Sequence, residues 1–174
     1  LAYNASIEFL LELKQQNILI DPAKVSISSA QAIEQQSHLV QDINPSTLFK
    51  SQKQPIEITH IRSAMTKDGV ALCHFFHWLD NALADKESIN ELTIDEKISS
   101  FRAQQTGFIG LSFSTIAGFN ANGALPHYRA TEESFSEISG DGLLLIDSGA
   151  QYDEGTTDIT RVVPIGTASV EQKR

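Results

Sequence analysis

Two aspartates, Asp147 and Asp158, are the residues of this 174-residue sequence whose type and spacing most directly indicate chemistry. Asp147 ends the apolar run 143–147, and Asp158 lies in the run 157–163, which is rich in β-branched residues. If these runs pair as antiparallel strands about a turn centred on residues 151–154, the two aspartates face each other with their Cβ atoms about 4.5 to 5.5 Å apart. Like charges at that separation repel, so the hairpin requires a group that compensates them.

Several groups would offset this repulsion, and the residues alone leave the choice open. A shared proton, an arginine or a metal ion would each do so. Carboxylate oxygens suit Mg, Ca or Mn, and an added histidine moves the preference toward Mn, Fe, Co or Zn. A simpler alternative is an exposed hairpin with both carboxylates in water. The apolar run that precedes Asp147 argues against this alternative.

The histidines and the cysteine give weaker signals. His127 ends the glycine-rich segment 107–128, and on its own it is typical of a polar loop residue. His74 and His77 have an i, i+3 spacing that can bind a metal, but without a third ligand nearby we expect them to pack or to lie on the helix surface. Cys73 lies in the same apolar stretch, where we expect a buried structural thiol.

Composition and absent motifs argue against several classes of protein. The formal net charge is -9 and the sequence has no cluster of lysine or arginine, so we expect no nucleic-acid partner and no anionic membrane partner. A single cysteine excludes an internal disulfide and is compatible with a reducing compartment. No apolar run reaches the ~18 residues that span a bilayer. The sequence also lacks G-x-S-x-G, Walker and Rossmann glycine motifs.

Hydrophobic periodicity predicts the elements that position these residues. The first 50 residues alternate between helical and extended patterns. This alternation predicts an α/β segment that forms the end of a larger domain. The expected elements are a helix at 3–17, a strand at 18–21, a helix at 28–36 and a strand at 39–43. The polar stretch 51–55, which contains a proline, then predicts a linker.

After the linker, apolar residues recur every three or four positions from Ile58 to Leu79 and predict one long amphipathic helix. A second helix is expected to start at a capping box formed by Thr93 and Glu96 and to end near residue 105. The segment 107–128 predicts a strand, an irregular loop and a return strand before the aspartate hairpin. The fold class expected from these elements is α/β (α+β).

Three segments together resemble the Xaa-Pro aminopeptidases (aminopeptidase P), in particular the long three-domain form. They are LIDSGAQYDEGTTDITR, SFSTIAGFNANGALPHY and IRSAMTKDGVALCHFFHWL. The resemblance implies that residues 1–53 are the C-terminal end of the second non-catalytic, creatinase N-terminal-like α/β domain. Residues 54–174 would then be the N-terminal half of the pita-bread metallopeptidase domain.

The same resemblance implies a site and a reaction. Asp147 matches a metal-ligand aspartate, Asp158 matches the aspartate that bridges two metal ions, and His127 matches a catalytic histidine that contacts the substrate. Thr160, two residues beyond Asp158, is a candidate for a residue that supports the metal ligands without binding the metal itself. The implied reaction is hydrolysis of the N-terminal Xaa-Pro bond by a water molecule that two divalent cations, commonly Mn²⁺, activate. Peptides with proline in the second position, a homodimeric parent protein and a cytoplasmic location are also implied.

The family completes its metal site with one histidine and two glutamates that this sequence does not reach. We therefore expect a fragment of a metallo-aminopeptidase that is inactive as an isolated chain. The alternatives are a prolidase-like dipeptidase, a methionine aminopeptidase and a catalytically inactive pita-bread binding module. Retention of both aspartates argues against the binding module, and the α/β segment before the linker argues against methionine aminopeptidase.

Overall fold

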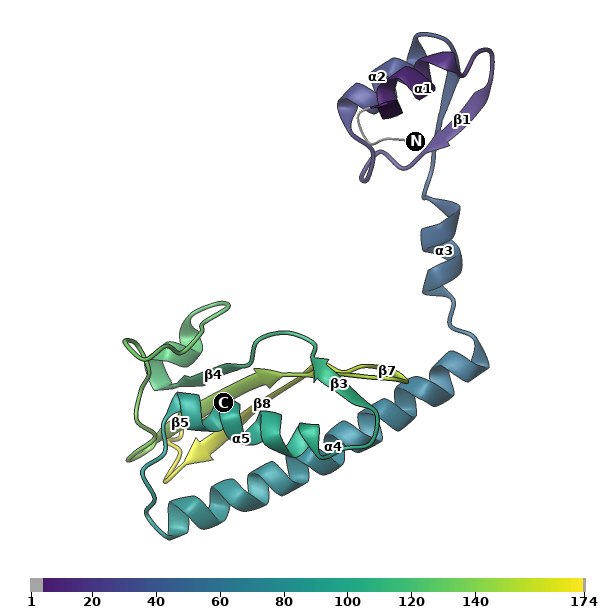
Figure 1. The fold of residues 1–174 in the computed structure, drawn as a ribbon. Coiled ribbons are helices and arrows are strands. Elements are labelled where there is room, and N and C mark those ends of the chain that lie inside the picture. Colours follow the sequence, from purple (N-terminus) through teal and green to yellow (C-terminus); the bar gives the residue numbers. More distant parts are fainter. Residues whose placement is uncertain (1–4, 174) are drawn as a thin grey trace. The chain divides into compact units, whose positions relative to one another are not determined.

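The computed structural model describes residues 5–173, and the chain divides into two compact units between Gln54 and Pro55 (Figure 1). This division falls within the polar stretch that predicts a linker. The assignment of the two units to a non-catalytic domain and to half of a catalytic domain stays a prediction. Within the described residues, no helix combines the length and the apolar composition needed to cross a lipid bilayer.

The first unit is a small α/β arrangement. Its elements are α1 (Ser6–Glu12), β1 (Asn17–Ile20), α2 (Ile27–Glu34), β2 (His38–Gln41) and α3 (Pro45–Ser51). β1 and β2 pair in parallel with α2 as the crossover, and the alternation of helices and strands agrees with the α/β prediction for this segment. The predicted helix 3–17 is longer than α1, and its first two residues lie outside the described part. Helix α3 was not predicted from the sequence. Asn44 caps this helix, since its side-chain oxygen accepts a hydrogen bond from the backbone N–H of Ser46 at 2.9 Å.

The second unit begins with the two predicted helices. α4 (Pro55–Ala84) is the long amphipathic helix, and α5 (Glu91–Ala103) is the second one. The predicted capping box is wrong, because α5 begins two residues before Thr93. The cap is Asn90, whose side-chain oxygen accepts a hydrogen bond from the backbone N–H of Thr93 at 2.9 Å. Glu91 therefore occupies the first position of the helix.

The strands of the second unit form two three-stranded antiparallel sheets, in the orders β4-β5-β8 and β3-β6-β7. The elements are β3 (Phe108–Leu111), β4 (Ile116–Phe119), the 3₁₀ helix η2 (Asn120–Ala124), β5 (Gly142–Ser148), β6 (Ala150–Tyr152), β7 (Gly155–Thr156) and β8 (Ile159–Ile165). β3 pairs with β6, whereas β4 pairs with β5. The strand at 116–119 therefore does not return along the strand at 108–111.

The main core lies between the two helices and one face of the β4-β5-β8 sheet. α4 and α5 contribute Phe75, Leu79, Ile94 and Ile98, and the sheet contributes residues such as Leu144 and Ile146; all six are buried. The buried positions of α4 recur at helical spacing, which leaves Cys73 on the outer side of the helix. The prediction of a buried thiol is wrong, because Cys73 is exposed.

A buried ion pair joins the two helices. Asp68 of α4 and Arg102 of α5 are both fully buried, and Arg102 donates from Nε and Nη2 to the two carboxylate oxygens at 2.7 and 3.0 Å. The hydroxyl of Tyr152 in β6 donates to Asp68 at 3.0 Å. Burial raises the pKa of Tyr152, and the negative charge of Asp68 raises it further, so the phenol stays protonated as a donor.

Removal of the arginine charge is expected to destabilise the second unit strongly. Arg102→Met leaves the carboxylate of Asp68 buried without a cation, which costs about 3 to 5 kcal/mol. Urea unfolding followed by circular dichroism measures the loss. The matched control is Arg129→Met at an exposed position, for which a change within about 0.5 kcal/mol is expected. Equal stabilities of the two variants would contradict the account.

A second ion pair ties the tip of the β6–β7 turn to α4. Lys67 donates to Glu154 at 2.5 Å, and the hydroxyl of Ser63 donates to the same oxygen at 3.0 Å. The hydrogen bond from Lys67 is the main reason that the pKa of Glu154 lies below its ordinary value.

This lowered pKa predicts the sign of a pH effect. The folded-state pKa lies below the ordinary value of 4.5, so the carboxylate stabilises the fold above that pH. Its contribution is lost as the pH falls through the folded-state pKa. Glu154→Gln should therefore reduce the drop in unfolding free energy between about pH 6 and about pH 3. The exposed Glu132→Gln is the control, and an unchanged pH dependence in Glu154→Gln would refute the role of this pair.

Candidate functional site

The position of Asp147 follows from the alternation of β5. Leu144, Ile146 and Ser148 are buried, whereas Leu143, Leu145 and Asp147 are half-buried. Successive side chains of a strand point to opposite faces of the sheet. The buried set faces the helices, so Asp147 lies on the face of the sheet turned away from the core.

The predicted register of the aspartate hairpin is wrong. β5 pairs with β8 so that Asp147 lies opposite Thr160, and Ser148 lies opposite Ile159. The reason is the turn: Tyr152 pairs with Gly155, which places the turn one residue later than the centre assumed from the sequence. Asp158 immediately precedes β8 and is exposed, as is Thr160, while Ile159 between them is buried. Asp158 is therefore a diagonal neighbour of Asp147 rather than its direct partner.

Thr160 contacts Asp147 directly. Its hydroxyl donates to Asp147 Oδ1 at 2.8 Å. Among the described residues, Asp147 Oδ2 and both oxygens of Asp158 have no hydrogen-bond donor and no ion-pair partner. The expected partnership of Thr160 with a candidate ligand is thus present in the structure, while its role in metal binding stays a prediction.

His127 is the third candidate, and its backbone is unusual. It is exposed and has a φ of 57°, in the left-handed region that non-glycine residues seldom occupy. Such conformations persist where the surrounding structure holds them, and they concentrate at functional sites. The positive φ of His127 therefore marks it as a candidate for function.

His127 and Asp147 line the same pocket, together with Thr160. The pocket has a volume of about 290 Å³, and apolar residues that include Ile116, Leu125 and Leu145 form much of the rest of its wall. Asp158 does not line it. The structure therefore brings together two of the three predicted site residues, with the third, Asp158, directly before the neighbouring strand β8.

A buried glutamate, Glu91, holds the segment that carries His127. It is fully buried and accepts hydrogen bonds from the backbone N–H groups of Phe119 and Ser136 at 2.7 and 2.8 Å. Asn122 Nδ2 lies 3.1 Å from both carboxylate oxygens, and the Tyr128 hydroxyl lies 2.8 Å from one of them. Burial raises the pKa of Tyr128, and its hydrogen bond to Glu91 adds to the rise. The sequence analysis missed Glu91, because hydrophobic periodicity carries no signal for a buried carboxylate.

Close backbone contact also fixes the start of this segment. A Cβ on Gly118 would lie 2.7 Å from the backbone N of Gly123, closer than such atoms approach in proteins. Glycine at position 118 therefore allows η2 to lie directly against β4. This contact gives the glycine-rich pattern of the sequence a packing reason.

The other histidine candidates do not form a site. The ring of His74 stacks on Phe101 with the centroids 6.1 Å apart, and His77 Nε2 lies 3.2 Å from the side-chain amide of Asn81. Both are exposed, which confirms the expectation that they pack or lie on the helix surface.

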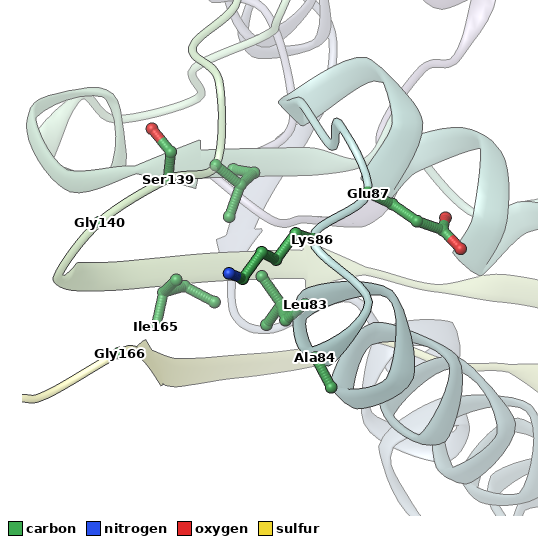
Figure 2. Close-up of a pocket in the computed structure, with 9 residues that line it drawn as sticks. Leu83, Ala84, Lys86, Glu87, Ser139, Gly140, Ile165 and Gly166 are labelled. Carbon is green, nitrogen blue, oxygen red and sulfur yellow. The ribbon is translucent and has the colours of Figure 1, made fainter.

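A larger hollow of about 510 Å³ lies beside Gly140 and Ile165, near the opposite end of β5 from Asp147. Figure 2 shows Leu83, Ile165 and Lys86 around it, with Glu87 turned away. None of the predicted site residues lines it. Its two titratable residues, Lys86 and Glu87, point away from each other (Figure 2), so the smaller pocket is the better candidate.

The two aspartates fit part of a site for divalent cations. Carboxylate oxygens without a protein donor are suitable ligands for hard cations, and the bond from Thr160 orients one carboxylate. No group of three or more His, Cys, Asp and Glu residues capable of holding a metal ion occurs within residues 5–173. The described chain therefore offers two carboxylates to such a site, and their role as metal ligands stays a prediction.

Comparison with known proteins establishes the class. Residues 59–174, about two thirds of the chain, match metallopeptidase family M24. The chain belongs to this family.

The individual relatives are more specific. The chain is 39% identical to Xaa-Pro aminopeptidase 1 of Dictyostelium discoideum over 94% of its own length and 26% of the relative's. It is 33% identical to aminopeptidase P1 of Arabidopsis thaliana, with coverages of 88% and 27%. The chain thus spans about a quarter of the length of these relatives.

A solved structure confirms the fold class. The X-prolyl aminopeptidase of Caenorhabditis elegans, described as a cytosolic enzyme with a di-nuclear active site, is similar with a TM-score of 0.81 and 26% identity. The similarity covers 97% of this chain and 29% of that one. The predicted α/β fold class is therefore confirmed, whereas the assignment of residues 54–174 to half of a pita-bread domain stays a prediction.

The left-handed backbone of His127 leads to a stability prediction. Glycine accepts a positive φ without steric cost, whereas alanine pays for it. We expect His127→Gly to be more stable than His127→Ala by about 1 kcal/mol, measured by urea unfolding. The reference pair is Arg129→Gly and Arg129→Ala, at an exposed position outside the residues with positive φ. If glycine is the less stable residue at both positions, the strain at His127 is refuted.

Proposed function

We propose that the protein to which this chain belongs is a metal-dependent Xaa-Pro aminopeptidase, and that the chain forms part of its active site. The observation that carries the proposal is the shared pocket of His127, Asp147 and Thr160. The names of the relatives support the reaction class. The substrates would be peptides with proline in the second position.

Asp147 and Asp158 would each supply carboxylate ligands to a pair of divalent cations, with Mn²⁺ as the proposed metal. When bound, such cations polarise the scissile carbonyl and lower the pKa of a water molecule. Thr160 would hold Asp147 in orientation through Oδ1, which leaves Oδ2 available for a ligand bond. The remaining ligands would come from residues that this chain does not contain.

His127 would contact the peptide at the reacting bond. Its imidazole can donate a hydrogen bond to the carbonyl oxygen as negative charge develops there, or accept one from the substrate. The apolar wall formed by Ile116, Leu125 and Leu145 would exclude water from one side of the peptide. Exclusion of water strengthens the electrostatic interactions of the charged groups beside it.

The proposal extends to the setting of the protein. A cytoplasmic location and a homodimeric assembly are consistent with the family resemblance, and the Caenorhabditis elegans protein is described as cytosolic. Neither nucleic acid nor membrane is proposed as a partner. A prolidase-like dipeptidase and an inactive binding module are the alternatives that the experiment below distinguishes.

The test uses the complete protein that carries this segment. It should cleave an Xaa-Pro-Xaa tripeptide faster than an Xaa-Pro dipeptide, lose activity after treatment with a chelator and regain it with Mn²⁺. Asp147→Asn and Asp158→Asn should abolish activity. Thr160→Val should lower metal affinity or activity about 10- to 100-fold, whereas the exposed Thr167→Val should not change either.

Each failure has a different meaning. Preference for the dipeptide would favour the prolidase alternative. A folded protein that neither binds Mn²⁺ nor cleaves either peptide would favour the binding module. Full activity in Asp147→Asn would refute the proposed site.

A further inference from the structure

We propose that Glu91 is a positioning residue that acts through His127, by holding segment 119–136 in the conformation that places the imidazole at the pocket of Asp147. The catalytic part of this inference rests on the proposed function. Its structural part, that one buried carboxylate organises the segment, can be tested without activity.

Glu91 closes the segment at both ends. The backbone N–H of Phe119 donates to one carboxylate oxygen at 2.7 Å, and the backbone N–H of Ser136 donates to the other at 2.8 Å. The backbone N–H of Glu91 in turn donates to the carbonyl of Ser136 at 3.2 Å. A single residue at the start of α5 therefore joins the two ends of the segment that contains His127.

Glu91 also holds the interior of the segment. Asn122 Nδ2 lies 3.1 Å from both carboxylate oxygens, and the hydroxyl of Tyr128 lies 2.8 Å from Glu91 Oε2. Tyr128 directly follows His127, whose own side chain is exposed. The strained φ of His127 thus lies next to an anchored residue, which is the condition under which such a conformation persists.

The donor count explains why a carboxylate is needed. Both oxygens of an ionised glutamate accept hydrogen bonds, and the fully buried side chain of Glu91 has donors at each oxygen. Glutamine has the same shape but only one acceptor oxygen, and its NH₂ group would face the backbone N–H of Phe119 or of Ser136. A buried backbone donor would lose its partner, and the segment would relax to recover one.

Glu91 also connects the segment to helix α5. It is the first residue of α5, in the turn where acidic side chains interact favourably with the helix dipole. The same residue therefore belongs to the first turn of α5 and anchors the segment that carries His127. Helix α5 itself is fixed to α4 by the ion pair of Arg102 and Asp68. The location of His127 is connected through these contacts to the rigid part of the unit.

The experiment measures kinetics and amide exchange on the complete protein. Glu91→Gln should lower kcat/KM for an Xaa-Pro-Xaa peptide about 10- to 100-fold, the effect expected from a small misplacement of a catalytic group. The amides of Phe119 and Ser136 should exchange faster with solvent, while the bound Mn²⁺ content stays unchanged. The matched control, Glu132→Gln, makes the same chemical change at an exposed position of the same segment and should behave like the wild type.

A double-mutant cycle separates positioning from a general structural effect. If Glu91 acts through His127, adding Glu91→Gln to His127→Ala should cause no further loss of kcat/KM, because effects of residues in one network are not additive. Losses that multiply would overturn the proposal. If Glu91→Gln does not fold, Tyr128→Phe takes its place in the cycle, with an expected loss between about twofold and tenfold from one missing hydrogen bond.

The two proposals fail in different ways. A wild-type protein that binds Mn²⁺ but cleaves no Xaa-Pro peptide refutes the proposed function and, with it, the catalytic role of Glu91. An active wild type with unchanged kinetics in Glu91→Gln refutes the catalytic role of Glu91 alone. Unchanged exchange of Phe119 and Ser136 in that variant refutes its structural role, whether or not the protein is active.

Discussion

The alternation of side chains along β5 is the constraint on which both the core and the candidate site depend. Leu144 and Ile146 face the helices and are buried, while Asp147 faces the opposite side of the same sheet. A shift of one residue in this strand would exchange the two faces, placing a carboxylate in the core and apolar side chains in the pocket. The hydrophobic core therefore fixes the direction in which Asp147 points, and the site needs no separate device for that purpose.

Buried polar contacts then join the elements that surround this strand to one another. The ion pair of Asp68 and Arg102 joins the helices, and Tyr152 adds the β6 strand to it. Glu91 does the same for the segment that carries His127. Such groups are costly to bury without partners, so the folds that satisfy them are favoured over those that do not. The candidate site residues lie on the central strand β5, directly before β8 and in the segment after η2, beside the elements that these contacts join.

Periodicity was sufficient for the long elements but neither for the short helix α3 nor for the registers of the strands. α4 and β5 were predictable because long, regular patterns report which face of an element is buried. The partner of Asp147 was not, because it depends on the turn: a centre one residue later moves the opposite residue from Asp158 to Thr160. The burial of Cys73 was predicted wrongly, since an apolar run covers more of a helix than the stripe that is buried.

The site residues differ in the same way: some can be recognised from the local sequence, and others only from contacts between distant parts of the chain. Asp147 and Asp158 stood out from residue type and spacing, whereas His127 was found only through resemblance to a known family. Glu91 was not found at all, because it accepts hydrogen bonds from residues 28 to 45 positions away in the sequence. No local pattern records such contacts.

Anomalous diffraction at the manganese edge, from crystals of the complete protein grown with Mn²⁺, tests the central claim most directly. The account predicts two peaks about 3.5 to 4 Å apart, with carboxylate oxygens of both Asp147 and Asp158 as ligands. A well-ordered structure with Mn²⁺ bound away from these aspartates, or with no Mn²⁺ bound, would contradict it.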